Sequence, residues 1–362
     1  MTRVAILTPS LTTADAVSND VLGMFDVLRR QGHQVRIFCE SHSLSHSAVY
    51  ELARLRKFLK SSADILIYHH SRGWHPGVQL ISELRCRRVI RYHNVTPAKF
   101  FKGFSRTDED FSELGRRELI ELAAAQCNLY LSASSFSMHE LIEIGADASR
   151  SLVVPPFHHI ERLLKIAADQ QTLEKYSGAT ANVLTVGRVV PHKNVHHLIE
   201  IFAHYHYDYN KKSRLLIAGK GGEGLSTYSK LLHRAVQKLG LTNAVVFTGG
   251  VSDEVLKAYY LVSDAFVTVS EHEGFCVPLV EAMSMKLPIT TYASTAIPET
   301  LGDAGIVWTE RKPMLIAETI DLFVRDSSVR DALGRRGRRR YESMFTNEKA
   351  ERIFLQAMSK LQ

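Results

Sequence analysis

The chain has 362 residues, a formal net charge of +7 at pH 7 and four cysteines. This length exceeds one ordinary hydrophobic core, so we expect two domains of roughly 150 to 200 residues each. No apolar run approaches the roughly 18 residues that span a bilayer, and the start MTRVAILTPS is typical of a strand rather than a signal peptide. The cysteines form no C-x-x-C pair, which disfavours a zinc or disulfide framework and favours reduced thiols in the cytoplasm. The positive charge favours acidic partners, without choosing among nucleotides, anionic lipids, glycans and nucleic acid.

The first half of the chain alternates short apolar segments with amphipathic ones. Segments that predict strands lie at 4–9, 35–40, 64–70, 87–94, 129–134 and 151–156. Segments that predict helices lie near 18–30, 46–60, 109–125 and 136–144. This βαβ rhythm indicates a doubly wound parallel sheet, so we expect a Rossmann-like domain over residues 1–165.

A second series of the same kind follows a passage without strand character. Residues 166–180 are small and polar toward their end, and we expect a linker there. Further predicted strands lie at 182–189, 214–221, 244–250, 264–270, 288–292 and 304–308. Residues 181–346 are therefore predicted to form a second Rossmann-like α/β domain.

The segment EHEGFCVPLVEAMS, residues 271–284, carries the main chemical signal. It follows a β-branched apolar run, and Pro278 suits the first turn of a helix. Ligands bind at the carboxyl ends of strands in open α/β sheets, and Gly274 allows close backbone approach beside a helix start that attracts anions. Glu273 and Glu281 flank this turn, so we expect both carboxylates to face one pocket and to bind hydroxyls of sugar and ribose.

A second signal is TVGRVVPHKN, residues 185–194, which places Arg188 and Lys193 on a loop after a strand. A guanidinium fork and an ammonium point charge together can neutralise a departing diphosphate without any metal. The alternative is a solvent-exposed loop with incidental charge. The presence of both segments in one domain favours the diphosphate site.

The two segments together resemble retaining glycosyltransferases of family 4, also described as glycosyl transferases group 1. The spacing of Glu273 and Glu281 matches the E-x7-E pattern of that family, and Arg188 and Lys193 match its paired phosphate-binding cations. The resemblance implies a GT-B fold, in which two Rossmann-like domains face each other across a cleft. Cys276 departs from the usual G-F-G-x-P, and cysteine strains this turn if the family's glycine has a positive φ.

The same resemblance implies roles for the residues that contact the reacting part of the donor. Glu273 is expected near the reacting carbon of the sugar, and Arg188 and Lys193 are expected to assist departure of the diphosphate. The backbone amides around Phe275 and Cys276 are expected to touch sugar or phosphate. No metal or separate cofactor is implied, since the nucleoside-diphosphate sugar is itself a substrate.

Further positions follow from the resemblance. Glu281 is expected to hold the ribose hydroxyls, and residues near Val251 are expected to line the base. His93, at the end of a predicted strand, is expected to contact the donor sugar, with capping or packing as the alternative. The final helix, about residues 347–362, is expected to return to the N-terminal domain.

Two segments are candidates for contact with an anionic membrane. Residues 47–62 interleave apolar and basic side chains, which is typical either of a helix lying on lipid or of a sheet-covering helix with a basic outer face. Phe100, Phe101 and Phe104 form a second candidate patch. The acidic triplet at 108–110 is better explained as the first turn of a helix than as a metal site.

These observations predict an enzyme that moves a hexose-like sugar from a nucleoside diphosphate to a hydroxyl of a glycan or lipid-linked acceptor. The product would belong to a surface polysaccharide, and the enzyme would act in the cytoplasm or peripherally on the inner face of the plasma membrane. The alternatives are a GT-B sugar-nucleotide epimerase and a non-catalytic protein that binds glycan or nucleic acid. A pure binding protein needs no diphosphate cradle, so we expect no nucleic-acid partner.

Overall fold

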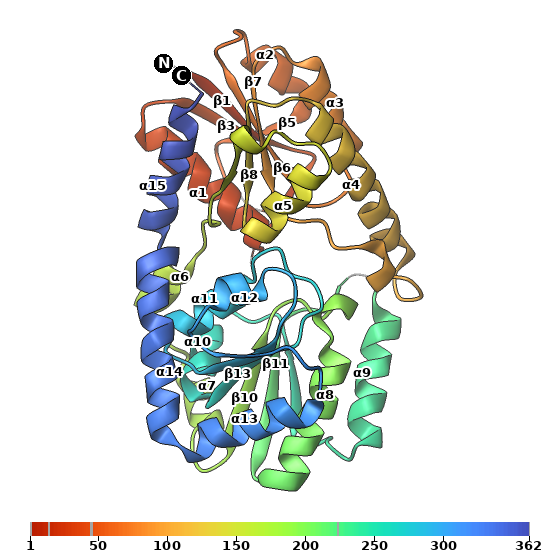
Figure 1. Ribbon diagram of the computed structural model, residues 1–362, viewed down its shortest axis with the longest axis vertical. Coiled ribbons are helices and arrows are strands. Elements are labelled where there is room, and N and C mark those ends of the chain that lie inside the picture. The colour runs from red at the N-terminus through yellow and green to blue at the C-terminus, as the bar shows by residue number, and fades with distance from the viewer. Residues whose placement is uncertain (1, 14, 44–45, 223, 362) are drawn as a thin grey trace. The chain divides into compact units, whose positions relative to one another are not determined.

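The computed structural model describes residues 2–13, 15–43, 46–222 and 224–361 (Figure 1). The chain divides into two compact units. Unit 1 contains Met1–Lys99, Asp108–His159 and Thr346–Gln362. Unit 2 contains Phe100–Thr107 and Ile160–Phe345. Each unit is built on its own parallel sheet, as the two βαβ series in the sequence predicted.

The sheet of unit 1 has seven strands in the order β5-β3-β1-β6-β7-β8-β9. They are β1 (Arg3–Leu7), β3 (Gln34–Cys39), β5 (Val49–Glu51), β6 (Ile65–His70), β7 (Arg87–Tyr92), β8 (Leu129–Ser132) and β9 (Ser151–Val153). A separate short parallel pair is formed by β2 (Ser10–Leu11) and β4 (Ser41–His42). The chain runs outward from β1 in both directions, which creates the topological switch point where Rossmann-like domains bind ligands.

Helices cover both faces of this sheet because alternate residues of each strand point to opposite sides. The helices of unit 1 are α1 (Ala16–Arg30), α2 (Leu55–Phe58), α3 (His75–Glu83), α4 (Arg106–Ala124), α5 (Ser135–Glu143) and α15 (Asn347–Ser359). Val4 and Ile6 share a core with α1 and α15, whereas Ala5 and Leu7 share one with α3 and α4. The C-terminal helix α15 is therefore part of the core of unit 1, where it lies beside α1 (Figure 1).

The sheet of unit 2 has six parallel strands in the order β12-β11-β10-β13-β14-β15. They are β10 (Ala181–Val186), β11 (Ser213–Ala218), β12 (Val245–Gly249), β13 (Ala265–Thr268), β14 (Ile289–Tyr292) and β15 (Ile306–Trp308). The helices are α6 (Ile160–Lys165), α7 (Gln170–Tyr176), α8 (Val195–His204), α9 (Ser226–Lys238), α10 (Asp253–Val262), α11 (Val277–Ser284), α12 (Ile297–Leu301), α13 (Pro313–Arg325) and α14 (Ser327–Arg340). One core joins α8, α9 and α13 to the sheet. The switch point lies between β10 and β13.

Several local predictions differ from the structure. The helix expected at 46–60 is wrong, because the segment forms the edge strand β5, a 3-10 turn and the single-turn helix α2. Its apolar side chains Leu55 and Phe58 are buried in the core of unit 1, so the segment has no long amphipathic face for a membrane. Helix α3 was not predicted. Residues 166–180, for which the sequence predicted a linker, contain α7, which packs against α10.

The second candidate membrane patch is a packing element of unit 2. Phe101 is buried with its ring edge against His192, at 5.7 Å between centroids, and Phe104 packs edge-on against Tyr228 at 5.3 Å. These phenylalanines therefore hold residues 100–107 on unit 2. Among the described residues, no helix is both long and apolar enough to cross a bilayer. The four cysteines are free thiols, as predicted.

Candidate active site

Two loops of unit 2 come together at the carboxyl ends of β10 and β13. After β10 the chain turns at Gly187, whose φ is 142°, and then presents the exposed side chain of Arg188. A short 3-10 turn, η4 (Pro191–Lys193), leads into α8. The backbone N–H of Glu271, after β13, donates to the carbonyl of His192 at 2.8 Å. This bond fixes the cationic loop against the acidic one.

Lys193 and Glu273 form an ion pair across these two loops. The ammonium Nζ lies 2.5 Å from Oε1 of Glu273, and the side chains are 20% and 8% exposed. Thr295 holds the backbone of Glu273 on both sides, because its hydroxyl accepts from the Glu273 N–H and donates to the Glu273 carbonyl. The structure thus brings together two of the residues that the sequence singled out, on a rigid and largely desolvated support.

Two cationic side chains, Arg188 and Lys193, flank a buried histidine on the loop after β10. His192 lies between Arg188 and Lys193 in the sequence. Its side chain is buried, and its pKa lies well below the usual range. Burial is the main cause, and the charges of Lys193 and Arg188 add to it. A neutral imidazole in this position leaves the two cations as the charged groups of the loop. Glu273 balances the charge of Lys193, whereas Arg188 is exposed and can attract an anion.

Cys276 occupies a left-handed conformation, with φ of 75° and ψ of 71°, immediately before α11. Glycine adopts this conformation without cost, whereas a side chain at Cβ strains it. Burial, and next the neighbouring Glu273 carboxylate, raise the pKa of the thiol well above its usual value, so it stays protonated. The strain expected for a cysteine at this turn is therefore present beside the ion pair.

The other residues predicted around α11 have different surroundings. Glu281 is buried, and its Oε2 accepts a hydrogen bond from the Tyr260 hydroxyl at 2.7 Å. Burial and the Glu281 carboxylate raise the pKa of Tyr260 well above its usual value, so it remains a donor. The ring of Phe275 packs edge-on against Phe345 at 5.5 Å. A contact of Phe275 with a ligand would therefore involve its backbone rather than its ring.

Glycines lie at the carboxyl ends of the two strands on the other side of β10: Gly219 follows β11, and Gly249 is the last residue of β12. A Cβ at Gly219 would lie 1.8 Å from the carbonyl oxygen of Gly187, so only glycine fits there. The N–H of Gly219 donates to the carbonyl of Gly249, which ends β12. Val251 follows at this end of the sheet and is half-buried. The carboxyl ends of β10, β11 and β12 thus form one continuous surface next to Arg188.

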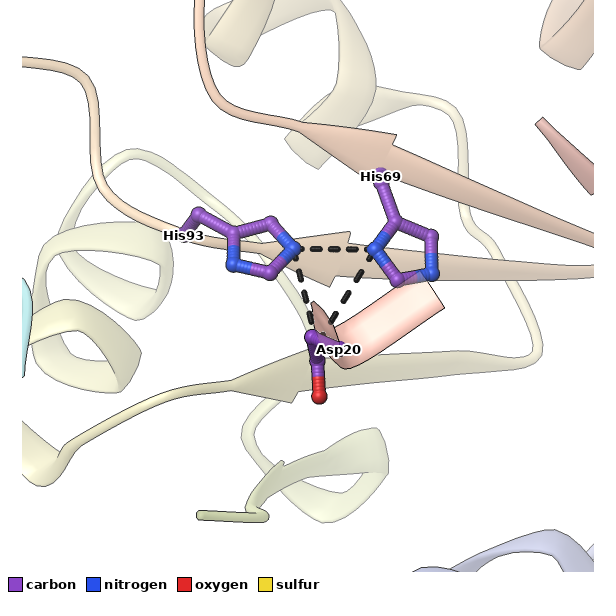
Figure 2. Close-up of side chains that lie close together, drawn as sticks. All are labelled: Asp20, His69 and His93. Atoms are coloured by element: carbon purple, nitrogen blue, oxygen red, sulfur yellow. Dashed lines mark hydrogen bonds and ion pairs between the residues drawn. The ribbon is translucent and has the colours of Figure 1, made fainter. Parts of the chain in front are cut away.

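His93 belongs to unit 1, where it follows β7. Its Nε2 lies 2.9 Å from Nδ1 of His69, which belongs to β6, and 3.6 Å from Oδ2 of Asp20 in α1 (Figure 2). Arg91 donates to the same carboxylate oxygen at 2.6 Å. The sequence indicated His93 but missed Asp20 and Arg91. One signal was available, because Asp20 shares the buried face of α1 with Met24 and Val27, where an acidic residue is unusual.

Two parallel sheets in Rossmann-like units, with binding loops at the carboxyl ends of the strands, define the GT-B fold. The whole chain resembles the solved structure of HepE from Anabaena in complex with UDP and glucose. The TM-score is 0.79 at 17% identity, and the match covers 99% of this chain and 100% of HepE.

Within this fold, residues 170–340 match the model of the family described as Glycosyl transferases group 1. The chain is 27% identical over 212 residues to the O-antigen chain mannosyltransferase B of Escherichia coli, covering 58% of this chain and 55% of the relative. It is 30% identical over 166 residues to the capsular polysaccharide biosynthesis glycosyltransferase CapM of Staphylococcus aureus, covering 45% and 42%. The chain thus spans about half the length of these two relatives.

Proposed function

We propose that this protein is a retaining glycosyltransferase of family 4. It transfers a hexose-like sugar from a nucleoside diphosphate to a hydroxyl of a glycan or lipid-linked acceptor, in the biosynthesis of a surface polysaccharide. The observation that carries the proposal is the Lys193–Glu273 pair beside Arg188, at the carboxyl ends of β10 and β13. The pair lies in the segment that matches the glycosyl transferase family, and the O-antigen and capsule relatives support the class of product.

In this proposal the donor diphosphate binds on the cationic loop. Arg188 offers a planar fork of donors and Lys193 a point charge, so together they balance the negative charge that develops on the leaving oxygen. The bond from the anomeric carbon to the diphosphate oxygen breaks, and the acceptor hydroxyl attacks from the same face. Its proton passes to the departing phosphate. This step needs no metal, because the two cations supply the charge.

Glu273 has two tasks in the proposed reaction. Without substrate, its carboxylate holds Lys193, which keeps the ammonium at the mouth of the loop. With substrate, it faces the sugar, where a negative charge stabilises the positive character that develops at the anomeric carbon. The proposal includes the other predicted donor contacts. Glu281 holds the ribose, Val251 lines the base, and the backbone at Phe275 and Cys276 contacts phosphate or sugar.

The test is a transfer assay with UDP-, GDP- and ADP-hexoses and with glycan and lipid-linked acceptors. One donor should give a product of retained anomeric configuration, and Lys193→Ala or Glu273→Gln should reduce its rate by roughly a hundredfold or more. Lys212→Ala is the matched control. Lys212 is exposed and immediately precedes β11, so it lies at the amino ends of the strands, whereas the site lies at their carboxyl ends. Full transfer by either site variant would contradict the proposal.

The same assay separates the alternatives. A product that forms from the donor alone, with one sugar centre inverted, would indicate an epimerase instead of a transferase. Binding of nucleic acid that falls with salt and is unaffected by nucleoside diphosphates would indicate a non-catalytic binding protein. The proposed place of action is the cytoplasm, with contact at the inner face of the plasma membrane tested by sedimentation with anionic vesicles.

A further inference from the structure

Unit 1 contains a buried pair of imidazoles beside one carboxylate (Figure 2). His69 and Asp20 are fully buried, and the side chain of His93 is nearly so. Nδ1 of His69 and Nε2 of His93 lie 2.9 Å apart, which is a hydrogen-bond distance. The carboxylate oxygen Oδ2 of Asp20 lies farther away, 3.9 Å from the His69 nitrogen and 3.6 Å from the His93 nitrogen. The short contact is therefore the one between the two rings.

The three ligand atoms are also close enough to surround a metal ion, but the neighbouring charge disfavours one. Arg91 is fully buried, and its Nε donates to Oδ2 of Asp20 at 2.6 Å. The other carboxylate oxygen accepts the backbone N–H of Phe157 at 2.8 Å. The carboxylate is thus already satisfied, and a divalent cation would add its charge beside a desolvated guanidinium. A hydrogen bond between neutral rings fits the surroundings better.

A single proton can lie between the two ring nitrogens, because one must donate and the other accept. Burial lowers the pKa of both His69 and His93 well below the usual range, and the Arg91 charge acts in the same direction on each. Both rings are therefore neutral at pH 7, and each carries one proton. The pair has two possible arrangements, which differ in the ring that donates.

The outer nitrogen of His69 decides between these arrangements. Its Nε2 is buried and has no hydrogen-bond partner among the residues that the structure describes. If His93 donated, the proton of His69 would lie on Nε2 as a buried N–H without an acceptor. If His69 donates, Nε2 is only a bare acceptor. Buried N–H groups without partners are rarer than incompletely satisfied acceptors, so donation by His69 is favoured.

We propose that His69 is a positioning residue that fixes the tautomer of His93. It donates from Nδ1 to Nε2 of His93, so that His93 carries its own proton on Nδ1. This second nitrogen lies on the ring edge that points away from both Asp20 and His69 (Figure 2). His93 therefore presents a neutral N–H donor, suited to an oxygen acceptor such as a sugar hydroxyl or a phosphate oxygen. The use of this donor in catalysis rests on the proposed function; the tautomer does not.

The direct test is nitrogen-15 NMR of the full chain with labelled histidine at pH 7, with His93 assigned by the loss of its signals in His93→Gln. We expect His93 to be protonated at Nδ1 and unprotonated at Nε2, and His69 to be protonated at Nδ1. Protonation of His93 at Nε2, protonation of either ring at both nitrogens, or a change in both rings on adding one equivalent of Zn²⁺ would each overturn the proposal.

Two substitutions at His69 give a second, matched test. His69→Phe keeps a ring but removes the donor, so the proton of His93 should move to Nε2, where only Asp20 remains to accept it. His69→Asn places an amide N–H near the former Nδ1 and should restore the original tautomer. In the transfer assay we expect His69→Phe to lose about tenfold in kcat/KM, the value of one hydrogen bond, with recovery in His69→Asn. An unchanged His93 spectrum in His69→Phe would overturn the proposal. Absence of transfer in the unsubstituted chain would instead count against the proposed function alone.

Discussion

The left-handed backbone of Cys276 gives the sharpest prediction about stability. Cys276→Gly and Cys276→Ala both remove the buried thiol, so that loss cancels when the two variants are compared. The alanine variant keeps the strain of a Cβ at φ 75°, which costs about 1–2 kcal/mol. The glycine variant loses about 0.4–1 kcal/mol, because its unfolded chain has more freedom. We therefore expect glycine to be more stable than alanine by about 1 kcal/mol, the reverse of the usual order.

The assay is thermal unfolding measured by differential scanning calorimetry in the absence of nucleotide. A difference of this size in a unit of this length corresponds to a shift of about 2–4 °C in the midpoint of the transition that reports unit 2. Cys127 is the matched control, because it is buried and does not have a positive φ. There the alanine variant should be more stable than the glycine variant. If Cys276→Ala equals or exceeds Cys276→Gly in stability, the argument from strain is refuted.

Two further predictions concern the loop after β11 and a buried histidine. Gly219→Ala places a Cβ 1.8 Å from the Gly187 oxygen and should displace the loop that carries Arg188. Isothermal titration calorimetry should then detect no binding of the nucleoside-diphosphate donor. Gly221→Ala meets nothing within 4 Å and should bind normally; equal affinities in the two variants would contradict this explanation. Burial lowers the pKa of His70 from the usual 6.5 to about 4. Between pH 6.5 and 4 the histidine is protonated in the unfolded chain but neutral in the folded one. Its contribution to the free energy of unfolding is therefore fully present above pH 6.5 and is lost by about 1.4 kcal/mol per pH unit as pH falls toward 4. The free energy of unfolding, measured by urea titration at several pH values, should fall less steeply with decreasing pH in His70→Gln than in the unsubstituted chain. Equal dependence on pH in the two proteins would contradict the lowered pKa of His70.

Most strands of the two sheets were predictable because the sequence signal for a buried strand is local. Short runs rich in Val, Ile and Leu, each followed by a polar turn, predict the central strands of a parallel sheet. The edge segment at 46–60 misled the prediction, because its apolar side chains recur at a spacing that a helix and an edge strand with a turn share. Helix α3 was missed because its first turn contains Pro76 and Gly77, residue types that are equally typical of a loop. Local pattern alone does not separate these cases.

The candidate site was predictable where its residues follow strands directly. Lys193 and Glu273 lie on loops after adjacent parallel strands, so the topology alone places them at one edge, and the structure shows their contact. The strain at Cys276 was predictable only as a condition, since φ is not readable from sequence. The contact of Asp20 with His69 and His93 joins a helix face to two strand ends, and such tertiary contacts leave no local signature. The contact between Lys193 and Glu273 does not test what these residues do. The roles of all the predicted site residues stay predictions: Arg188, Lys193, Glu273, Glu281, Val251, Phe275, Cys276 and His93.

The central claim is that Arg188 and Lys193 hold a diphosphate. Isothermal titration calorimetry of UDP, GDP and ADP into the full chain tests this claim most directly. We expect one of them to bind, and Arg188→Ala and Lys193→Ala each to weaken that binding by roughly tenfold to a hundredfold, the value of a charge-assisted hydrogen bond, while Lys212→Ala leaves it unchanged. Equal affinities in all four proteins, or no binding of any nucleoside diphosphate to the unsubstituted chain, would contradict the claim.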